Sequence, residues 1–105
     1  MPDQTAFRMT LHPGQAAEYE RRHDEITPDL VTALKDAGVS DYSIWLDPQS
    51  NHLFGILTRS DDNTLDALPG TEVVKRWWAF MRDIMDSHPD NSPVQIPLRR
   101  VFYLP

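Results

Sequence analysis

The sequence contains no cysteine. This absence excludes a disulfide framework, a thiolate metal site and catalysis by a cysteine nucleophile. The sequence also lacks a glycine-rich phosphate loop and a Ser-His-Asp signature. Any catalytic chemistry must therefore come from other side chains.

Long apolar runs are missing too, since no stretch approaches the ~20 residues that a membrane-spanning helix needs. The first residues, Met-Pro-Asp-Gln-Thr, lack the basic and apolar regions of a signal peptide. The formal net charge is −6 at pH 7, which repels the phosphates of nucleic acids. We therefore expect a cytoplasmic protein that binds neither membranes nor nucleic acid.

The composition is that of an ordinary globular protein, with 105 residues of which 40% are hydrophobic and 25% charged. No repeat, low-complexity tract or linker divides the chain, so residues 1–105 are predicted to form a single domain.

Apolar periodicity predicts an alternating order of strands and helices. Residues two apart alternate in predicted strands at 6–11, 42–47, 53–58 and 95–104. Spacings of three and four predict helices over about 15–37 and 71–85. Thr27-Pro28 makes the first either one kinked helix or two in series, and a short helix or turn ends near Pro69-Gly70.

The order strand, helix, strand, strand, helix, strand is typical of an α+β protein with a ferredoxin-like βαββαβ sandwich. Both helices then lie on one face of an antiparallel sheet. Trp45, Phe54 and Ile56 alternate with the core set and make the other face apolar. We therefore predict a homodimer that packs sheet against sheet.

Tyr19 and His23 form the best candidate for a catalytic pair. They lie four residues apart on the apolar stripe of the first helix, so both side chains point inward. One interpretation is a structural tyrosine with a hydrogen-bonded core histidine. The other is a general acid/base histidine, with its ordinary pKa of ~6.5, beside a hydroxyl that orients a substrate.

Aromatic residues supply further candidates. Adjacent helix positions diverge by roughly 100°, so we expect one of Trp77 and Trp78 in the core and the other beside a cavity. An indole gives a pyranose a stacking surface and an N–H donor, although plain core packing is the alternative. Tyr42 and Trp45 face opposite ways, so only one of them can join a site under the helices.

The remaining polar positions carry weaker signals. Asp90-Asn91-Ser92 is either a sugar-binding loop or an ordinary turn. Three histidines fall in predicted turns and should lie at the surface without forming a metal site: His12, His52 and His88. The charged residues around His23 are predicted to form the solvated side of the first helix: Glu20, Arg21, Arg22, Asp24 and Glu25.

Five segments of the sequence resemble the L-rhamnose mutarotase family, in the same order and spacing. They are Glu-Tyr-Glu-Arg-Arg-His at 18–23, Tyr-Ser-Ile-Trp-Leu-Asp at 42–47, Arg-Trp-Trp-Ala-Phe-Met at 76–81, Pro-Asp-Asn-Ser-Pro at 89–93 and Val-Phe-Tyr-Leu-Pro at 101–105. The resemblance runs from Phe7 to the last residue. It departs at 24–28, where the family usually reads Asp-Pro-Ile-Trp-Pro and this chain reads Asp-Glu-Ile-Thr-Pro, which leaves room beside the first helix.

The resemblance implies a homodimeric ferredoxin-like α/β barrel that interconverts the α and β anomers of L-rhamnose without a metal or nucleotide cofactor. It implies His23 as proton donor, and contacts to the sugar from Tyr19, Tyr42, Trp77 and Trp78. We expect the His23 imidazolium to protonate the ring oxygen while water or a hydroxyl takes the anomeric proton. The alternatives are a non-catalytic sugar-binding module and a cofactor-free oxygenase.

Overall fold

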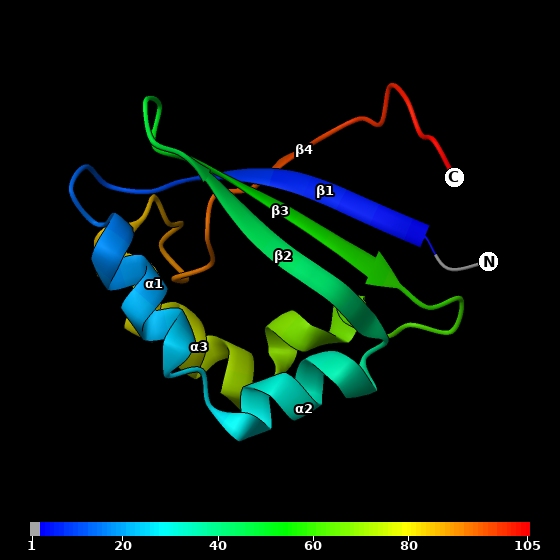
Figure 1. Ribbon diagram of the computed structural model, residues 1–105. Helices are drawn as coiled ribbons and strands as arrows, with labels where there is room; N and C mark the ends of the chain where they lie inside the picture. The colour runs from blue at the N-terminus through cyan, green and yellow to red at the C-terminus, as the bar shows by residue number, and fades with distance from the viewer. Residues whose placement is uncertain (1–2) are drawn as a thin grey trace.

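Four antiparallel strands form one sheet in the order β2-β3-β1-β4 (Figure 1). The computed structural model describes residues 3–105, so residues 1 and 2 of the predicted domain lie outside it. The strands are β1 (Asp3–Thr10), β2 (Val39–Asp47), β3 (His52–Arg59) and β4 (Ile96–Pro97). This strand order and the element order are those of the expected βαββαβ arrangement.

The helices all cover one face of the sheet (Figure 1). They are α1 (Ala16–Asp24), α2 (Pro28–Asp36) and α3 (Glu72–Met81), with short 3-10 turns η1 (Leu65–Gly70) and η2 (Arg82–Ile84). The long helix predicted over 15–37 is two helices in series. Pro28 is the first residue of α2, and Thr27 before it is extended, as a residue preceding proline prefers.

Two predicted elements are shorter than expected. The α-helix predicted to reach Met85 ends at Met81, because the backbone beyond η2 pairs with the end of β1 instead. His12 N–H donates to the Ile84 carbonyl (2.8 Å), and Asp86 N–H donates to the Thr10 carbonyl (3.0 Å).

The strand predicted over 95–104 is only Ile96–Pro97. Ile96 lies opposite Arg8 and Pro97 opposite Phe7, and Leu98 N–H adds one bond to the Ala6 carbonyl (3.0 Å). Pro97 has no N–H to extend the ladder. Beyond Leu98 the segment 99–104 has no regular secondary structure, and Figure 1 shows it leaving the sheet.

The core fills the space between the sheet and the helices. Its buried strand residues alternate along β1 and β3: Phe7, Met9, Leu53 and Leu57. Gly55 lies opposite Phe7, and a Cβ at this glycine would overlap the Phe7 ring. The glycine therefore lets the Phe7 ring lie flat across β3, in edge-to-face contact with Tyr42 at 6.2 Å between centroids.

The other face of the sheet carries apolar side chains that no helix covers. Trp45 lies opposite Phe54, and Ser43 opposite Ile56, on this face. Trp45 is 64% exposed and donates its indole N–H to the Ser43 hydroxyl (3.0 Å). The two side chains lie on opposite faces as expected, with Tyr42 against the core Phe7 ring and Trp45 opposite Phe54. Both residues nevertheless border the cavity between helices and sheet, so the expectation that only one of them can join it was wrong. Within residues 3–105, no helix has the length and apolarity required to span a membrane.

Candidate active site

A cavity of about 1050 Å³ lies between the helices and the sheet. Its walls are mainly apolar and come from all three helices, from β1, β2 and β3, and from the segment after η2. All five residues predicted to form the site line it: Tyr19, His23, Tyr42, Trp77 and Trp78.

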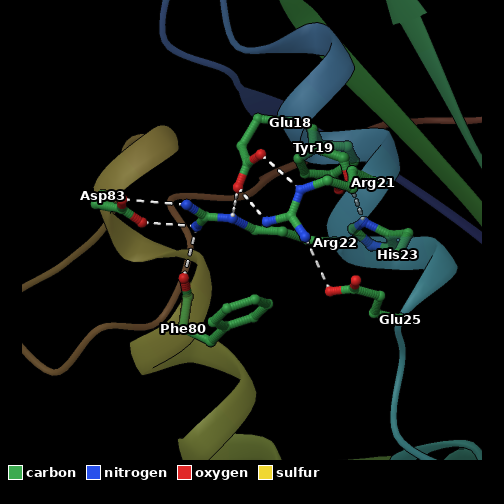
Figure 2. Close-up of polar contacts among 8 residues, drawn as sticks. All are labelled: Glu18, Tyr19, Arg21, Arg22, His23, Glu25, Phe80 and Asp83. Atoms are coloured by element: carbon green, nitrogen blue, oxygen red, sulfur yellow. Dashed lines mark hydrogen bonds and ion pairs between the residues drawn. The ribbon is translucent and has the colours of Figure 1, made fainter.

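Tyr19 and His23 stack one helical turn apart on the inner side of α1. Their ring centroids are 4.4 Å apart, and Tyr19 is buried while His23 is half-buried. His23 Nδ1 lies 3.0 Å from the Tyr19 carbonyl oxygen (Figure 2). Because a carbonyl only accepts, this contact places the proton of neutral His23 on Nδ1 and leaves the lone pair on Nε2.

Trp77 holds the other side of the imidazole. Its ring meets the His23 ring edge to face, at 5.1 Å and 85°. His23 is therefore fixed between a tyrosine from its own helix and a tryptophan from α3. Such packing restricts the imidazole to one orientation, which an acid/base group needs.

Burial sets the protonation states in the cavity. Loss of solvent lowers the pKa of His23 below its ordinary 6.5, and the Tyr19 carbonyl and the Asp24 charge only partly oppose this. Burial likewise raises the pKa of Tyr19, and it raises that of Tyr42 to about 12 even though 39% of that residue is exposed. At neutral pH the imidazole is therefore mainly uncharged, and both phenols keep their protons.

Tyr42 enters the cavity from a β-bulge that the sequence pattern did not reveal. Ser40 lies opposite Thr58 and Ser43 opposite Ile56, so Asp41 and Tyr42 together oppose only Leu57. Asp41 takes the left-handed conformation (φ 49°), which aspartate tolerates better than most residues. The extra residue redirects the strand just where Tyr42 meets the cavity.

The expectation for the paired tryptophans was wrong in one respect. Both Trp77 and Trp78 border the cavity and both are half-buried, rather than one in the core and one beside the cavity. Trp77 also packs against the core, and its ring contacts the exposed Phe80 ring at 5.8 Å between centroids. Two adjacent side chains that diverge on α3 therefore both reach the cavity wall.

We predicted that the charged residues around His23 form the solvated side of α1. This prediction is wrong for Arg22, which is only 8% exposed. Its guanidinium donates to Glu18 (2.7 Å) within α1, and to both Asp83 oxygens (2.7 and 3.2 Å) in η2 (Figure 2). It also donates to the Phe80 carbonyl (2.7 Å) and lies 4.9 Å from the centre of the Phe80 ring. Arg22 therefore ties the helix that carries His23 to the end of the helix that carries Trp77.

The carboxylates around Arg22 are strongly favoured in their charged form. Hydrogen bonds from Arg21 and Arg22 lower the pKa of Glu18 from 4.5 to about 2. The hydrogen bond from Arg22 lowers the pKa of Asp83. This network is the main polar link between α1 and the α3–η2 segment, and sequence spacing alone gave no sign of it, since its partners lie about 60 residues apart.

The other histidines lie outside the cavity. His12 bonds through Nε2 to Asp86 (3.2 Å) and through Nδ1 to the Asp83 carbonyl (3.3 Å), and His88 is exposed. His52, predicted in a turn, is instead the first residue of β3 and is half-buried. Thr27, where the resembled family usually has tryptophan, is exposed, while its neighbour Ile26 lines the cavity. In the described part of the chain, no three acidic or histidine side chains gather as a metal-ligand group.

The chain has the fold of a known group of proteins. The structure superposes on the crystal structure of an L-rhamnose mutarotase from Formosa agariphila with a TM-score of 0.91 at 48% identity, covering 98% of this chain and 99% of that one. The two proteins thus share one α+β fold over nearly their whole length.

The family follows from the sequence matches. A family model described as L-rhamnose mutarotase matches residues 4–104. L-rhamnose mutarotases from Acidiphilium cryptum and Rhizobium meliloti are each 61% identical to this chain, the first over 98% of this chain and 99% of its own length, the second over 94% and 95%. The chain belongs to the L-rhamnose mutarotase family.

Proposed function

We propose that this chain works as a single domain that interconverts the α and β anomers of L-rhamnose. Membership of the L-rhamnose mutarotase family, over residues 4–104, supports the activity. The observation that carries the proposal at the level of residues is the imidazole of His23, fixed between Tyr19 and Trp77 on the wall of a cavity that is otherwise mainly apolar. His23 is the group in that wall best suited to move a proton near neutral pH.

Ring opening requires one proton to move from the anomeric oxygen to the ring oxygen. The bond between C1 and the ring oxygen breaks as the aldehyde C=O forms. Both oxygens are attached to C1, so Nε2 of His23 can take the proton from one and return it to the other. Rotation about the C1–C2 bond and closure by the reverse steps give the second anomer, with no net gain or loss of protons.

This order of steps begins with neutral His23 rather than with the imidazolium expected from the sequence. The lowered pKa of His23 and its bond from Nδ1 to the Tyr19 carbonyl support a neutral starting state with a free lone pair on Nε2. The imidazolium then forms during the reaction and acts as the proton donor to the ring oxygen.

The other candidate residues act on the sugar without exchanging protons. Because burial keeps Tyr19 and Tyr42 protonated, their hydroxyls serve as hydrogen-bond donors or acceptors for sugar hydroxyls. The faces of Trp77 and Trp78 offer apolar surface to the C–H side of a pyranose and to the methyl group of a 6-deoxy sugar.

The pH dependence of the rate distinguishes the two starting states. With neutral His23 as the active form, the protein-dependent rate rises as pH increases through a pKa below 6.5, and then stays level. The measurement is anomer exchange between pH 4.5 and 8.5, with the buffer rate subtracted at each pH. A rate that falls as pH rises through that pKa would assign the resting state to the imidazolium.

We further propose that the protein is a homodimer packed through the uncovered face of the sheet. That face presents Trp45, Ile56 and Ile96 to solvent. The adjoining segment is also apolar and exposed, at Val101, Phe102, Tyr103 and Leu104. An exposed apolar surface of this extent is characteristic of a protein interface, and a second copy offers a matching one.

Replacement of Trp45 by glutamate should convert the dimer to monomers, since it places a charge on each copy at an apolar position of the proposed interface. Light scattering coupled to size-exclusion chromatography measures the mass. Lys75→Glu, on the exposed side of α3, is the matched control and should leave the mass unchanged. A wild-type chain that elutes as a monomer at micromolar concentration would contradict the proposal.

The cytoplasmic location expected from the sequence stays a prediction.

Two other activities predict different results with the same protein. A sugar-binding module would bind L-rhamnose without accelerating anomer exchange, and a cofactor-free oxygenase would consume oxygen with an aromatic substrate and ignore sugars. NMR exchange spectroscopy, sugar binding and oxygen uptake on one preparation separate the three. Acceleration of exchange together with no oxygen uptake is the result that the proposal requires.

A further inference from the structure

The segment after η2 folds into a closed loop at the cavity wall. Ser87 and Pro93 form a bridge across its base, and His88 N–H donates to the Ser92 carbonyl (2.8 Å). Within it, Asn91 N–H donates to the His88 carbonyl (2.9 Å), and Asp90 accepts from the backbone N–H of Ser92 (2.9 Å). Asn91, which lines the cavity, is thus held by backbone bonds that do not use its side chain.

The Asn91 carboxamide stands out among the polar groups of this wall. Its Oδ1 is buried and accepts no hydrogen bond from any described residue, whereas the neighbouring Ser87 hydroxyl donates to the Met85 carbonyl (3.1 Å). A buried acceptor without a partner destabilises the folded chain. The backbone conformation explains only part of the residue choice. Its φ of 73° suits asparagine, but glycine would satisfy it without burying a polar group.

We propose that Asn91 is a further sugar-binding residue of this site, whose carboxamide accepts a hydrogen bond from a hydroxyl of the bound monosaccharide. This inference rests on the proposed function. Asn91 lines the cavity, and a hydrogen bond from the sugar satisfies an acceptor that the described residues leave unpaired. The amide also offers two N–H donors, so one side chain can recognise adjacent hydroxyls.

The test compares Asn91→Gly with wild type for L-rhamnose affinity and thermal stability. Glycine keeps the left-handed backbone and removes the side chain with its carboxamide. We expect affinity to fall about 2- to 10-fold, the effect of one neutral hydrogen bond. We also expect a melting temperature equal to or above that of wild type. Tryptophan fluorescence reports binding, because Trp77 and Trp78 line the cavity.

Two further variants sharpen the test. Asn51→Gly removes the other positive-φ asparagine (φ 62°), which lies in the β2–β3 turn, and should leave affinity unchanged. Asn91→Asp retains an acceptor oxygen and tolerates the same backbone conformation. It should bind within about threefold of wild type, and a larger loss of affinity at an unchanged melting temperature would overturn the acceptor role even if the glycine variant does not fold.

The outcomes separate this inference from the proposed function. Unchanged affinity in Asn91→Gly, or a loss of affinity matched by a loss of stability, overturns the role of Asn91 even when wild type accelerates exchange. A wild-type chain that binds L-rhamnose through Asn91 but does not accelerate exchange overturns only the catalytic proposal. A wild-type chain that does not bind L-rhamnose overturns both.

Discussion

Replacing His23 by alanine should lower the protein-dependent rate of L-rhamnose anomer exchange by about 10²- to 10⁴-fold, the usual contribution of one general acid/base group. Nε2 is the atom that carries the proton between the two sugar oxygens in the proposed reaction, and alanine offers no replacement. Saturation-transfer NMR on the anomeric protons measures the rate directly.

The protein should remain folded after this change. His23 is half-buried, and its imidazole bonds to the carbonyl of Tyr19 in its own helix. His88→Ala, at an exposed position outside the cavity, is the matched control and should keep the wild-type rate. Full activity in His23→Ala would remove His23 from the mechanism, while loss of folding would assign it a structural role.

Replacing Arg22 by methionine should reduce the free energy of unfolding by about 2–3 kcal/mol, the scale of lost hydrogen bonds to charged groups. Glu18 and Asp83 are partly exposed and return to water, but the Phe80 carbonyl loses its donor and α1 loses its link to η2. For a domain of this size, the melting temperature should fall by about 10–15 °C. Calorimetry or circular dichroism measures it.

Arg21→Met is the matched control for this prediction. Arg21 binds the same Glu18 and also Glu25, but about half of its side chain is exposed, so its loss should lower stability much less than the loss of Arg22. Equal effects of the two substitutions would contradict the role given to the buried arginine. Activity in Arg22→Met should also fall, because α1 carries His23 and the α3–η2 segment carries Trp77.

The Arg22 network should also make stability depend on acid pH. Hydrogen bonds from Arg21 first and Arg22 second hold the folded pKa of Glu18 at about 2 against an ordinary 4.5, so its contribution is present above about pH 4.5 and is lost as pH falls toward 2. Arg22→Met removes only the share that comes from Arg22. The lowered pKa of Asp83 acts in the same direction. Arg22→Met should therefore lose stability less steeply than wild type over this range.

The sequence predicted the features that depend on local pattern. Alternation in β1 and β3 and helical spacing in α1 and α3 located these elements to within a few residues. The four-residue spacing of Tyr19 and His23 predicted their shared inward face. These predictions succeeded because periodicity is a property of one segment and needs no knowledge of its neighbours.

The predictions that failed concern features that depend on contacts between distant segments. In the sequence, Arg22 cannot be told from the other charged residues of α1. Its burial depends on the Phe80 carbonyl and on Asp83, about 60 residues away. The bulge at Asp41 arises from the register between β2 and β3, and the helix predicted to Met85 ends early because that backbone pairs with β1. The apolar pattern over 95–104 was interpreted as a strand, but only Ile96–Pro97 finds a partner strand in the described chain.

The most direct test of the central claim is the rate of exchange between the α and β anomers of L-rhamnose, measured by saturation transfer at several concentrations of wild-type protein. We predict a rate that increases in proportion to protein concentration above the buffer rate, and that returns to the buffer rate in an equal series with His23→Ala. A wild-type rate equal to the buffer rate at every protein concentration would contradict the claim that this chain is a mutarotase acting on L-rhamnose.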